Sequence, residues 1–233
     1  MAQDIKVNLN TDDMAKAGVN FGHTVSKLHP KFKNYIAGVK SNVHVIDLEK
    51  TAKEFERALK FISGLVSEGK TILFVGTKIQ AKEIVKKTAE ECHMPYVVER
   101  WLGGTFTNFD TIAKRVDHLK DLESKKAHGD LEKYTKKERM NFDEEIESLK
   151  VKFEGIKNMA KLPEAVFILD LKKDDTCVRE AKRKGIKIIG IADSNIDPTI
   201  VDYPIPANDD AISSIAYILG KIKETIVNAK LNA

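Results

Sequence analysis

Runs of apolar residues alternate with amphipathic segments along most of the chain. Continuous apolar runs at Thr71–Val75, Ala165–Leu169 and Ile186–Ile191 are typical of strands buried on both faces of a parallel sheet. Shorter strands are predicted at Pro95–Val98 and Tyr203–Ile205, and helices at Lys78–His93, Thr176–Lys184 and Asp209–Asn228. Because strands that alternate with helices form right-handed βαβ units, the pattern predicts an α/β fold with a doubly wound, mostly parallel sheet.

The residues before the first buried run carry a different pattern. Two short apolar segments, Tyr35–Val39 and Val43–Ile46, flank Lys40-Ser41-Asn42 and predict a β-hairpin. The next segment, Leu48–Ser67, has apolar residues at helical spacing and is followed by Gly69, which suits the end of a helix. A shorter helix is predicted over Thr11–Ala17.

The alternation of strands and helices stops between Thr107 and Ala160, where two long charged helices are predicted instead. The second helix has apolar residues at the alternating spacing of four and three that marks a heptad seam: Phe142, Ile146, Leu149, Phe153 and Ile156. The first helix carries a matching apolar face formed by Ile112, Val116, Leu119 and Leu122. We therefore predict an antiparallel coiled-coil helical hairpin, residues 107–160, inserted into a Rossmann- or flavodoxin-like sheet domain of residues 1–106 and 161–233.

Composition places the protein among soluble globular chains. The 233 residues are 42% hydrophobic, which is enough to build a core. The two cysteines lie far apart in the sequence, a usage that suits a reducing compartment. The first residues lack a signal-peptide pattern, and no apolar run approaches the roughly 18 residues that span a bilayer. We expect a cytoplasmic protein without a membrane partner.

The positive charge is mild overall but unevenly placed. The formal net charge is +4, and residues 107–160 contain twelve basic and twelve acidic side chains. Within that insertion, Lys125–Arg139 contains six basic and three acidic residues, and residues 1–40 contain six lysines and three acids. These two regions are the ones predicted to contact a polyanion.

The segment RWLGGTFTNFDTI, Arg100–Ile112, has two interpretations. A glycine-rich turn that enters a helix can bind phosphate. It can equally form a junction in which Gly103-Gly104 turns the chain and Thr107 caps the next helix, with Asp110 at the third helical position. For Arg100, the sequence leaves open a salt bridge within the protein or a contact with RNA.

Signals for catalysis are weak. Gly76 and Lys78 follow a predicted strand in FVGTK, but the segment matches neither GxGxxG nor GxxxxGK[ST]. In ADSNIDP, Asp193, Asn195 and Asp197 suit acid–base chemistry or, equally, an Asx turn. The histidines and cysteines lack the paired spacing of zinc ligands. We predict a protein that is not an enzyme and has no cofactor or metal; the alternatives are an α/β enzyme that binds a phosphorylated ligand at the strand ends and a coiled-coil adaptor.

Eight ordered segments resemble one family. They are GVNFGH, PKFKNYI, VHVIDLEKT, ILFVGTK, ERWLGGTFTN, KLPEAVFILD, ADSNIDP and DYPIPANDDAISSI, spread roughly from Met14 to Ile218. In this order they resemble the bacterial-type small-subunit ribosomal protein two family. The resemblance implies a structural constituent of the small ribosomal subunit that binds small-subunit ribosomal RNA and neighbouring ribosomal proteins. It also implies recruitment of ribosomal protein one and a place in the cytoplasmic ribosome; no homo-oligomer is expected.

Basic side chains in the two positively charged regions and beside the glycine-rich segment are the candidate RNA contacts. Such side chains neutralise phosphates and position a protein without reading base sequence. The predicted RNA-binding residues are Lys27, Lys31, Lys33, Lys40, Arg100, Arg115, Lys125, Lys126, Lys136, Lys137 and Arg139.

Overall fold

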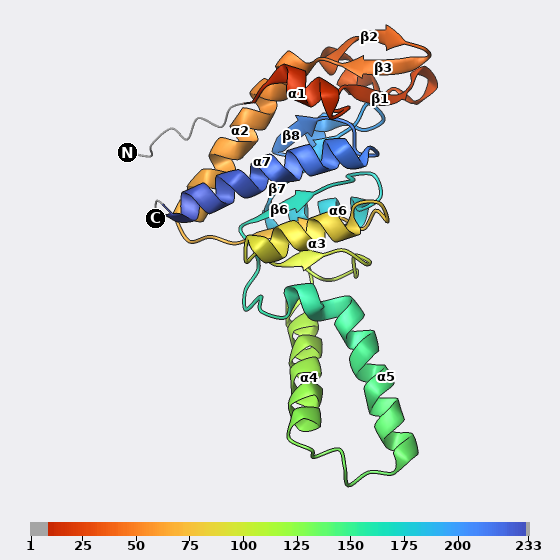
Figure 1. Ribbon diagram of the computed structural model, residues 1–233, viewed down its shortest axis with the longest axis vertical. Helices are drawn as coiled ribbons and strands as arrows, with labels where there is room; N and C mark the ends of the chain where they lie inside the picture. The colour runs from red at the N-terminus through yellow and green to blue at the C-terminus, as the bar shows by residue number, and fades with distance from the viewer. Residues whose placement is uncertain (1–8, 232–233) are drawn as a thin grey trace.

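The computed structural model describes residues 9–231 and contains two sheets and a projecting pair of helices (Figure 1). The larger sheet has five strands, and every neighbouring pair is parallel. Its strand order is β5 (Tyr96–Val97), β4 (Ile72–Val75), β6 (Ala165–Ile168), β7 (Lys187–Ala192) and β8 (Tyr203–Pro206). With β4 as the first strand of this sheet, the order is 2-1-3-4-5, one of the common doubly wound arrangements. The predicted α/β class and parallel sheet are confirmed.

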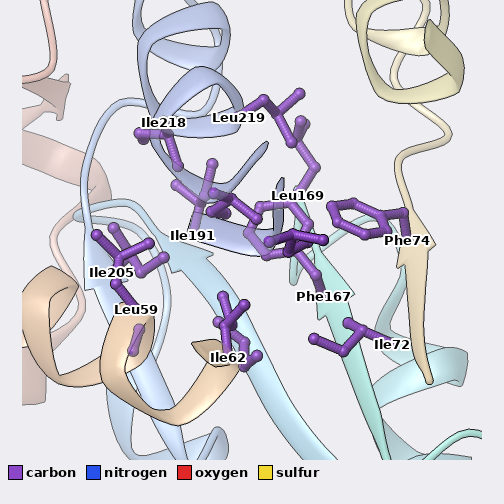
Figure 2. Packing of buried hydrophobic residues seen from close by; sticks show 14 of the residues in the cluster. Leu59, Ile62, Ile72, Phe74, Phe167, Leu169, Ile191, Ile205, Ile218 and Leu219 are labelled. Carbon is purple, nitrogen blue, oxygen red and sulfur yellow. The ribbon is translucent and has the colours of Figure 1, made fainter. Parts of the chain in front are cut away.

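Alternate residues of the central strands face two different hydrophobic cores. Ile72 and Phe74 of β4 point into one core, whereas Leu73 and Val75 point into the other. The first core is covered by α2 (Leu48–Ser67), α3 (Lys82–Glu91) and α7 (Ile212–Leu231), as Figure 2 shows for part of it. The second core is covered by α6 (Asp175–Lys184) and by the base of the projecting helices. Both faces of the sheet are therefore buried, which explains why its strands are continuous apolar runs.

Two helices begin later than the sequence pattern predicts. Helix α3 begins at Lys82 and not at Lys78, because the preceding residues form a loop whose polar side chains bond to groups at the strand ends. Helix α7 begins at Ile212 and not at Asp209. The side-chain oxygen of Asn208 accepts the backbone N–H groups of Asp210 and Ala211 and so forms a turn before the helix.

The smaller sheet lies next to α1 (Thr11–Lys16) and contains the predicted hairpin. Its antiparallel order is β1 (Phe21–Thr24), β3 (Val43–Ile46) and β2 (Ile36–Lys40). The hairpin turn is formed by Ser41 and Asn42, which both have positive φ angles, of 50° and 62°, as a type I′ turn requires. Strand β1 was not predicted, because the four residues FGHT contain only one large apolar side chain. Between β1 and β2 the chain forms the 3₁₀ helices η1 (Val25–Lys27) and η2 (Pro30–Tyr35).

The inserted segment forms α4 (Phe109–Ala127), α5 (Lys136–Phe153) and the 3₁₀ turn η3 (Glu154–Ile156). We call α4 and α5 the helical arm; they pack against each other and project away from the sheet (Figure 1). The apolar positions that the sequence pattern singles out are buried at Ile112, Val116, Leu119, Leu122, Ile146, Leu149, Phe153 and Ile156. The remaining position, Phe142, is half-buried and packs edge-on against Tyr134.

The base of the arm covers an edge of the main sheet. Turn η3 contacts β5, and a Cβ added to Gly155 would collide with the carbonyl oxygen of Tyr96. Only a glycine permits this approach. Since β5 is an edge strand, the contact also protects its backbone from pairing with another chain.

The predicted start of the arm is wrong by one residue. The residue before the first helical turn of α4 is Asn108 and not Thr107, so Asp110 occupies the second helical position. The reason is that Thr107 has another partner. Its backbone N–H and its hydroxyl both donate to the carboxylate of Glu180 in α6, at 3.1 and 3.2 Å.

Glu180 holds the whole glycine-rich loop against α6. Its carboxylate also accepts the backbone N–H groups of Gly104, at 2.7 Å, and Phe106, at 2.9 Å, and the indole N–H of Trp101, at 3.4 Å. The indole itself is buried and packs edge-on against the ring of Phe106, with 4.8 Å between ring centres. A buried carboxylate with five donors therefore fixes the loop from which the arm leaves the sheet.

These donors change the ionisation of Glu180. Burial alone would raise its pKa, but the N–H groups of Gly104, Phe106 and Thr107 and the indole of Trp101 outweigh burial and lower the pKa below the ordinary value of 4.5. Because the folded-state pKa is depressed, the stability that this carboxylate contributes is present above its unfolded-state pKa. It is lost as the pH falls through the lowered, folded-state value.

Glu180→Gln should lower the free energy of unfolding by about 1.5–3 kcal/mol, since a neutral amide cannot make the charge-assisted bonds to the loop. Urea unfolding at pH 7 measures the change. Glu144→Gln, on the exposed face of α5, is the matched control and should change stability by less than about 0.5 kcal/mol. Equal stability of the two variants would contradict the role given to Glu180.

Candidate nucleic-acid interface

The carboxyl ends of the parallel strands form the place where an α/β enzyme would bind its ligand. Lys78 follows β4 there, and its ammonium group lies 3.3 Å from Asp170, 2.9 Å from Asp209 and 2.7 Å from Asp210. Burial opposes the charge of Lys78, but the hydrogen bonds to Asp210 and Asp209 outweigh it and raise the pKa of the lysine. The cation that could attract a phosphate is therefore already surrounded by the protein's own carboxylates.

The carboxylates around Lys78 also influence one another. Burial, together with the nearby charges of Asp193 and Asp170, raises the pKa of Asp209 to about 7. On the other side of the cluster, Nδ1 of His23 lies 2.9 Å from Asp193, and this hydrogen bond raises the pKa of the histidine. At the strand ends, the cations Lys78 and His23 are thus paired with carboxylates of the same protein.

Other polar groups at the strand ends also have internal partners. Thr77 donates its hydroxyl to Asp174 at 3.0 Å, and burial raises the pKa of this carboxyl to about 6. Asn195 lies 3.0 Å from Nε2 of His23. Asp197 accepts the backbone N–H of Thr199 in an Asx turn, so the structural interpretation of ADSNIDP holds for this residue.

The glycine-rich loop is likewise occupied from within. Its backbone N–H groups, which could bind a phosphate, donate to Glu180. Carboxylate and phosphate compete for the same kind of donor. The junction interpretation of RWLGGTFTNFDTI is therefore the one that the geometry supports.

All eleven predicted RNA-binding side chains are exposed, but the structure does not bring them into one site. Lys27, Lys31, Lys33 and Lys40 lie on η1, η2 and β2, beside the small sheet. Lys125, Lys126, Lys136, Lys137 and Arg139 lie at the distal end of the helical arm, and Arg100 and Arg115 lie nearer its base. The small sheet and the arm are at opposite ends of the molecule's longest axis (Figure 1).

Three of these eleven cations form ion pairs within the protein. Lys31 pairs with Asp197 at 2.6 Å, Lys125 with Asp121 at 2.6 Å and Lys126 with Asp143 at 2.7 Å. Within residues 9–231 the other eight form no ion pair: Lys27, Lys33, Lys40, Arg100, Arg115, Lys136, Lys137 and Arg139. Arg100 therefore forms no salt bridge with a described residue.

Further basic residues border these groups and were not singled out by the sequence pattern. Lys50 and Lys53, three residues apart on α2, line a pocket with Lys33. Lys82, Lys86, Lys150 and Lys152 line a second pocket with Arg100, between α3, β5 and α5. In the sequence these lysines are marked only by the spacing within each pair, which is three, four or two residues. Such spacing is common on solvated helices and does not indicate a binding site.

No helix of residues 9–231 is both long enough and apolar enough to cross a membrane. Over the same range, no three His, Cys, Asp or Glu side chains are grouped so that they could hold a metal ion.

Lys78→Met should lower the free energy of unfolding by about 3 kcal/mol, because it leaves the neighbouring carboxylates without a cation. The loss should be smaller at pH 5 than at pH 8. Because the pKa of Asp209 in the folded protein is raised to about 7, this carboxyl is protonated and needs no cation at pH 5. The stabilisation that protonation provides is lost as the pH rises through about 7. Urea unfolding at both pH values tests this, with Lys172→Met, which borders the same hollow, as control. An unchanged stability would contradict a structural role for Lys78.

Comparison with known proteins identifies the family of the chain. Residues 14–229 match the family model described as "Ribosomal protein S2". A Thermus thermophilus protein named "Small ribosomal subunit protein uS2" is 44% identical over 224 residues, 96% of this chain and 88% of the relative. Proteins of the same name from Dehalococcoides mccartyi and Dictyoglomus thermophilum are 41% and 44% identical, over 95% and 93% of this chain and 90% and 88% of theirs. The chain therefore belongs to the ribosomal protein S2 family.

Proposed function

We propose that this protein is a structural constituent of the small ribosomal subunit, where it binds small-subunit ribosomal RNA and neighbouring ribosomal proteins and supports translation. The observation that carries the proposal is the family match over residues 14–229, almost the whole chain. The proposed place of action is the ribosome in the cytoplasm, and one copy acts without forming a homo-oligomer. Recruitment of ribosomal protein one is part of the proposal, as the family resemblance implies.

RNA binding would use the exposed cations at the two ends of the molecule. Lysine and arginine side chains without an internal partner lose little on meeting a phosphate, because no ion pair has to break. They would hold the RNA by its backbone and its shape and would not read its sequence. Their separation favours contact with two different elements of the folded RNA.

The arm would act as an inserted coiled-coil hairpin, residues 107–160, that extends the footprint of the sheet domain, residues 1–106 and 161–233. Three of its cations occupy unfavourable places for the fold. Lys136, Lys137 and Arg139 lie in the first turns of α5, close to the positive end of the helix dipole. Residues that do not stabilise their own helix are good candidates for binding an external polyanion.

A catalytic role has little support in the geometry. The side chains at the strand ends form hydrogen bonds and ion pairs with one another, and the amides of the glycine-rich loop bind Glu180. The alternative of an enzyme that binds a phosphorylated ligand would have to break these interactions first. The sheet is better described as a scaffold that holds two distant RNA contacts.

Replacing Lys136, Lys137 and Arg139 with Gln should weaken binding to small subunits that lack this protein by about tenfold at 0.15 M salt. Each lost phosphate contact should reduce the slope of log affinity against log salt concentration by about one. The thermal stability of the variant should not fall, because the helix dipole opposes these cations. Filter binding over a range of salt concentrations measures both affinity and slope.

The matched control removes three cations that already have internal partners: Lys16, which pairs with Asp13, Lys70, which pairs with Glu68, and Lys161, which pairs with Glu164. Replacing them with Gln changes the net charge by the same amount. Its affinity should stay within about threefold of the unmodified protein. If both triple variants lose the same affinity, the arm contributes only general charge and the proposed contact is wrong.

A further inference from the structure

A pocket of about 730 Å³ opens between η2, the start of β2 and the first turns of α2. Its volume lies within the range of roughly 300–1,000 Å³ that is usual for small-ligand sites. The lining consists of Lys33, Asn34, Tyr35, Ile36, Lys50, Lys53 and Glu54. It therefore combines three ammonium groups, a side-chain amide, an aromatic ring and an aliphatic side chain in one hollow.

The charges in this pocket leave a net positive surface. Glu54 is the only acid in the lining, and it already lies 3.4 Å from the guanidinium group of Arg57. Lys33 and Lys53 are exposed and form no ion pair with any residue in the described range. An anion that enters the pocket would meet two unpaired cations.

Other groups of the pocket are held in place. Lys50 donates to the backbone carbonyl of Asn34 at 2.6 Å and lies 3.4 Å from Asp47, so it ties α2 to the end of η2. The ring of Tyr35 packs at a tilt against the buried ring of Phe32, with 5.4 Å between centres. A ring that is fixed before binding loses little freedom when another ring stacks on it.

The side-chain amide of Asn34 is available to a ligand. It is exposed, and within residues 9–231 the side chain forms no hydrogen bond; Lys50 donates to the backbone carbonyl of the same residue. An amide has both donors and an acceptor, which match the edges of a nucleobase. The pocket thus offers a partner for each part of a nucleotide: cations for the phosphate, a ring for the base and an amide for its edge.

We propose that this pocket binds one unpaired nucleotide of small-subunit ribosomal RNA, with its phosphate on Lys33 and Lys53 and its base stacked on Tyr35. An unpaired nucleotide fits better than a duplex backbone, because only a splayed base can enter a hollow and stack on a side chain. An acidic segment of a protein would use the lysines but would leave the aromatic ring and the amide without a role. The inference rests on the proposed function and specifies one contact of it.

Photo-crosslinking in assembled subunits tests the proposal. Asn34 is replaced with the photoreactive residue p-benzoylphenylalanine, and the protein is added to small subunits that lack it. Irradiation should join position 34 to one short unpaired stretch of the RNA. The same replacement at exposed Ala216, on α7, serves as control and should give at least tenfold less crosslink at that stretch.

The outcomes separate this inference from the proposed function. Failure of the unmodified protein to join the subunits would contradict the proposed function itself. Normal incorporation with a crosslink only to a protein, to duplex RNA or to nothing would overturn the nucleotide pocket alone.

Affinity measurements with variants give a second, independent readout. Tyr35→Leu should weaken binding to the depleted subunits about tenfold, whereas Tyr35→Phe, which keeps the ring, should stay within twofold. Lys33→Gln combined with Lys53→Gln should reduce the salt slope by one to two; the control pair Lys70→Gln and Lys161→Gln should not. Thermal unfolding identifies any variant that is misfolded. Equal affinities for a folded Leu variant and the Phe variant would overturn the stacking contact.

Discussion

The bonds between Glu180 and the glycine-rich loop decide how the two parts of this protein are joined. The loop has to leave the sheet at β5, bury the indole of Trp101 and start a helix that points away from the core. Such a loop leaves several buried backbone N–H groups without a backbone partner. An unpaired buried donor costs about 1–3 kcal/mol. One carboxylate from α6 satisfies them all. The direction of the arm therefore depends on a side chain that lies more than seventy residues further along the chain.

The same principle closes the strand ends. In doubly wound sheets the carboxyl ends of the strands leave polar groups and helix termini facing one hollow, where enzymes bind their ligands. Here Lys78 and its three carboxylates, together with His23 and Asp193, partner one another across four strand ends and the small sheet. Within residues 9–231, cations without an ion-pair partner include Lys33 on η2, Lys53 on α2 and Lys136 on the arm. The scaffold is enzyme-like, but Lys78 at its strand ends is held by internal ion pairs.

Much of the fold follows from the sequence because buried strands and packed helices leave simple patterns of apolar residues. The runs at Ile72–Val75 and Ala165–Ile168 are apolar at every position, a pattern typical of a strand between two cores. The seam of the arm was equally clear from its spacing. Strand β1 and the exact start of α4 were missed, because both depend on distant partners. The backbone N–H of His23 bonds to Ser194, and Thr107 bonds to Glu180.

The candidate site was harder to predict for a physical reason. A surface lysine carries no periodic signal, so the sequence could name Lys33 but not its neighbours Lys50 and Lys53, which join it only when α2 packs beside η2. The same holds for ion pairing. Lys126 and Lys136 look alike in the sequence, yet only the first has an acidic partner on the facing helix, Asp143. Which cations are free is a property of the folded surface.

Directed cleavage of the RNA by a tethered iron complex tests the central claim of two distant RNA contacts most directly. Cys92 and Cys177 are both buried, and burial raises the pKa of each thiol, so single cysteines introduced elsewhere can be labelled selectively. The probe is attached at Lys40→Cys on the small sheet, at Arg139→Cys on the arm and at exposed Ile79→Cys by the strand ends. Two separate sets of cuts in the small-subunit RNA are expected from positions 40 and 139, with weak cutting from position 79. Strong cutting from position 79 alone, or one shared set of cuts, would contradict the claim.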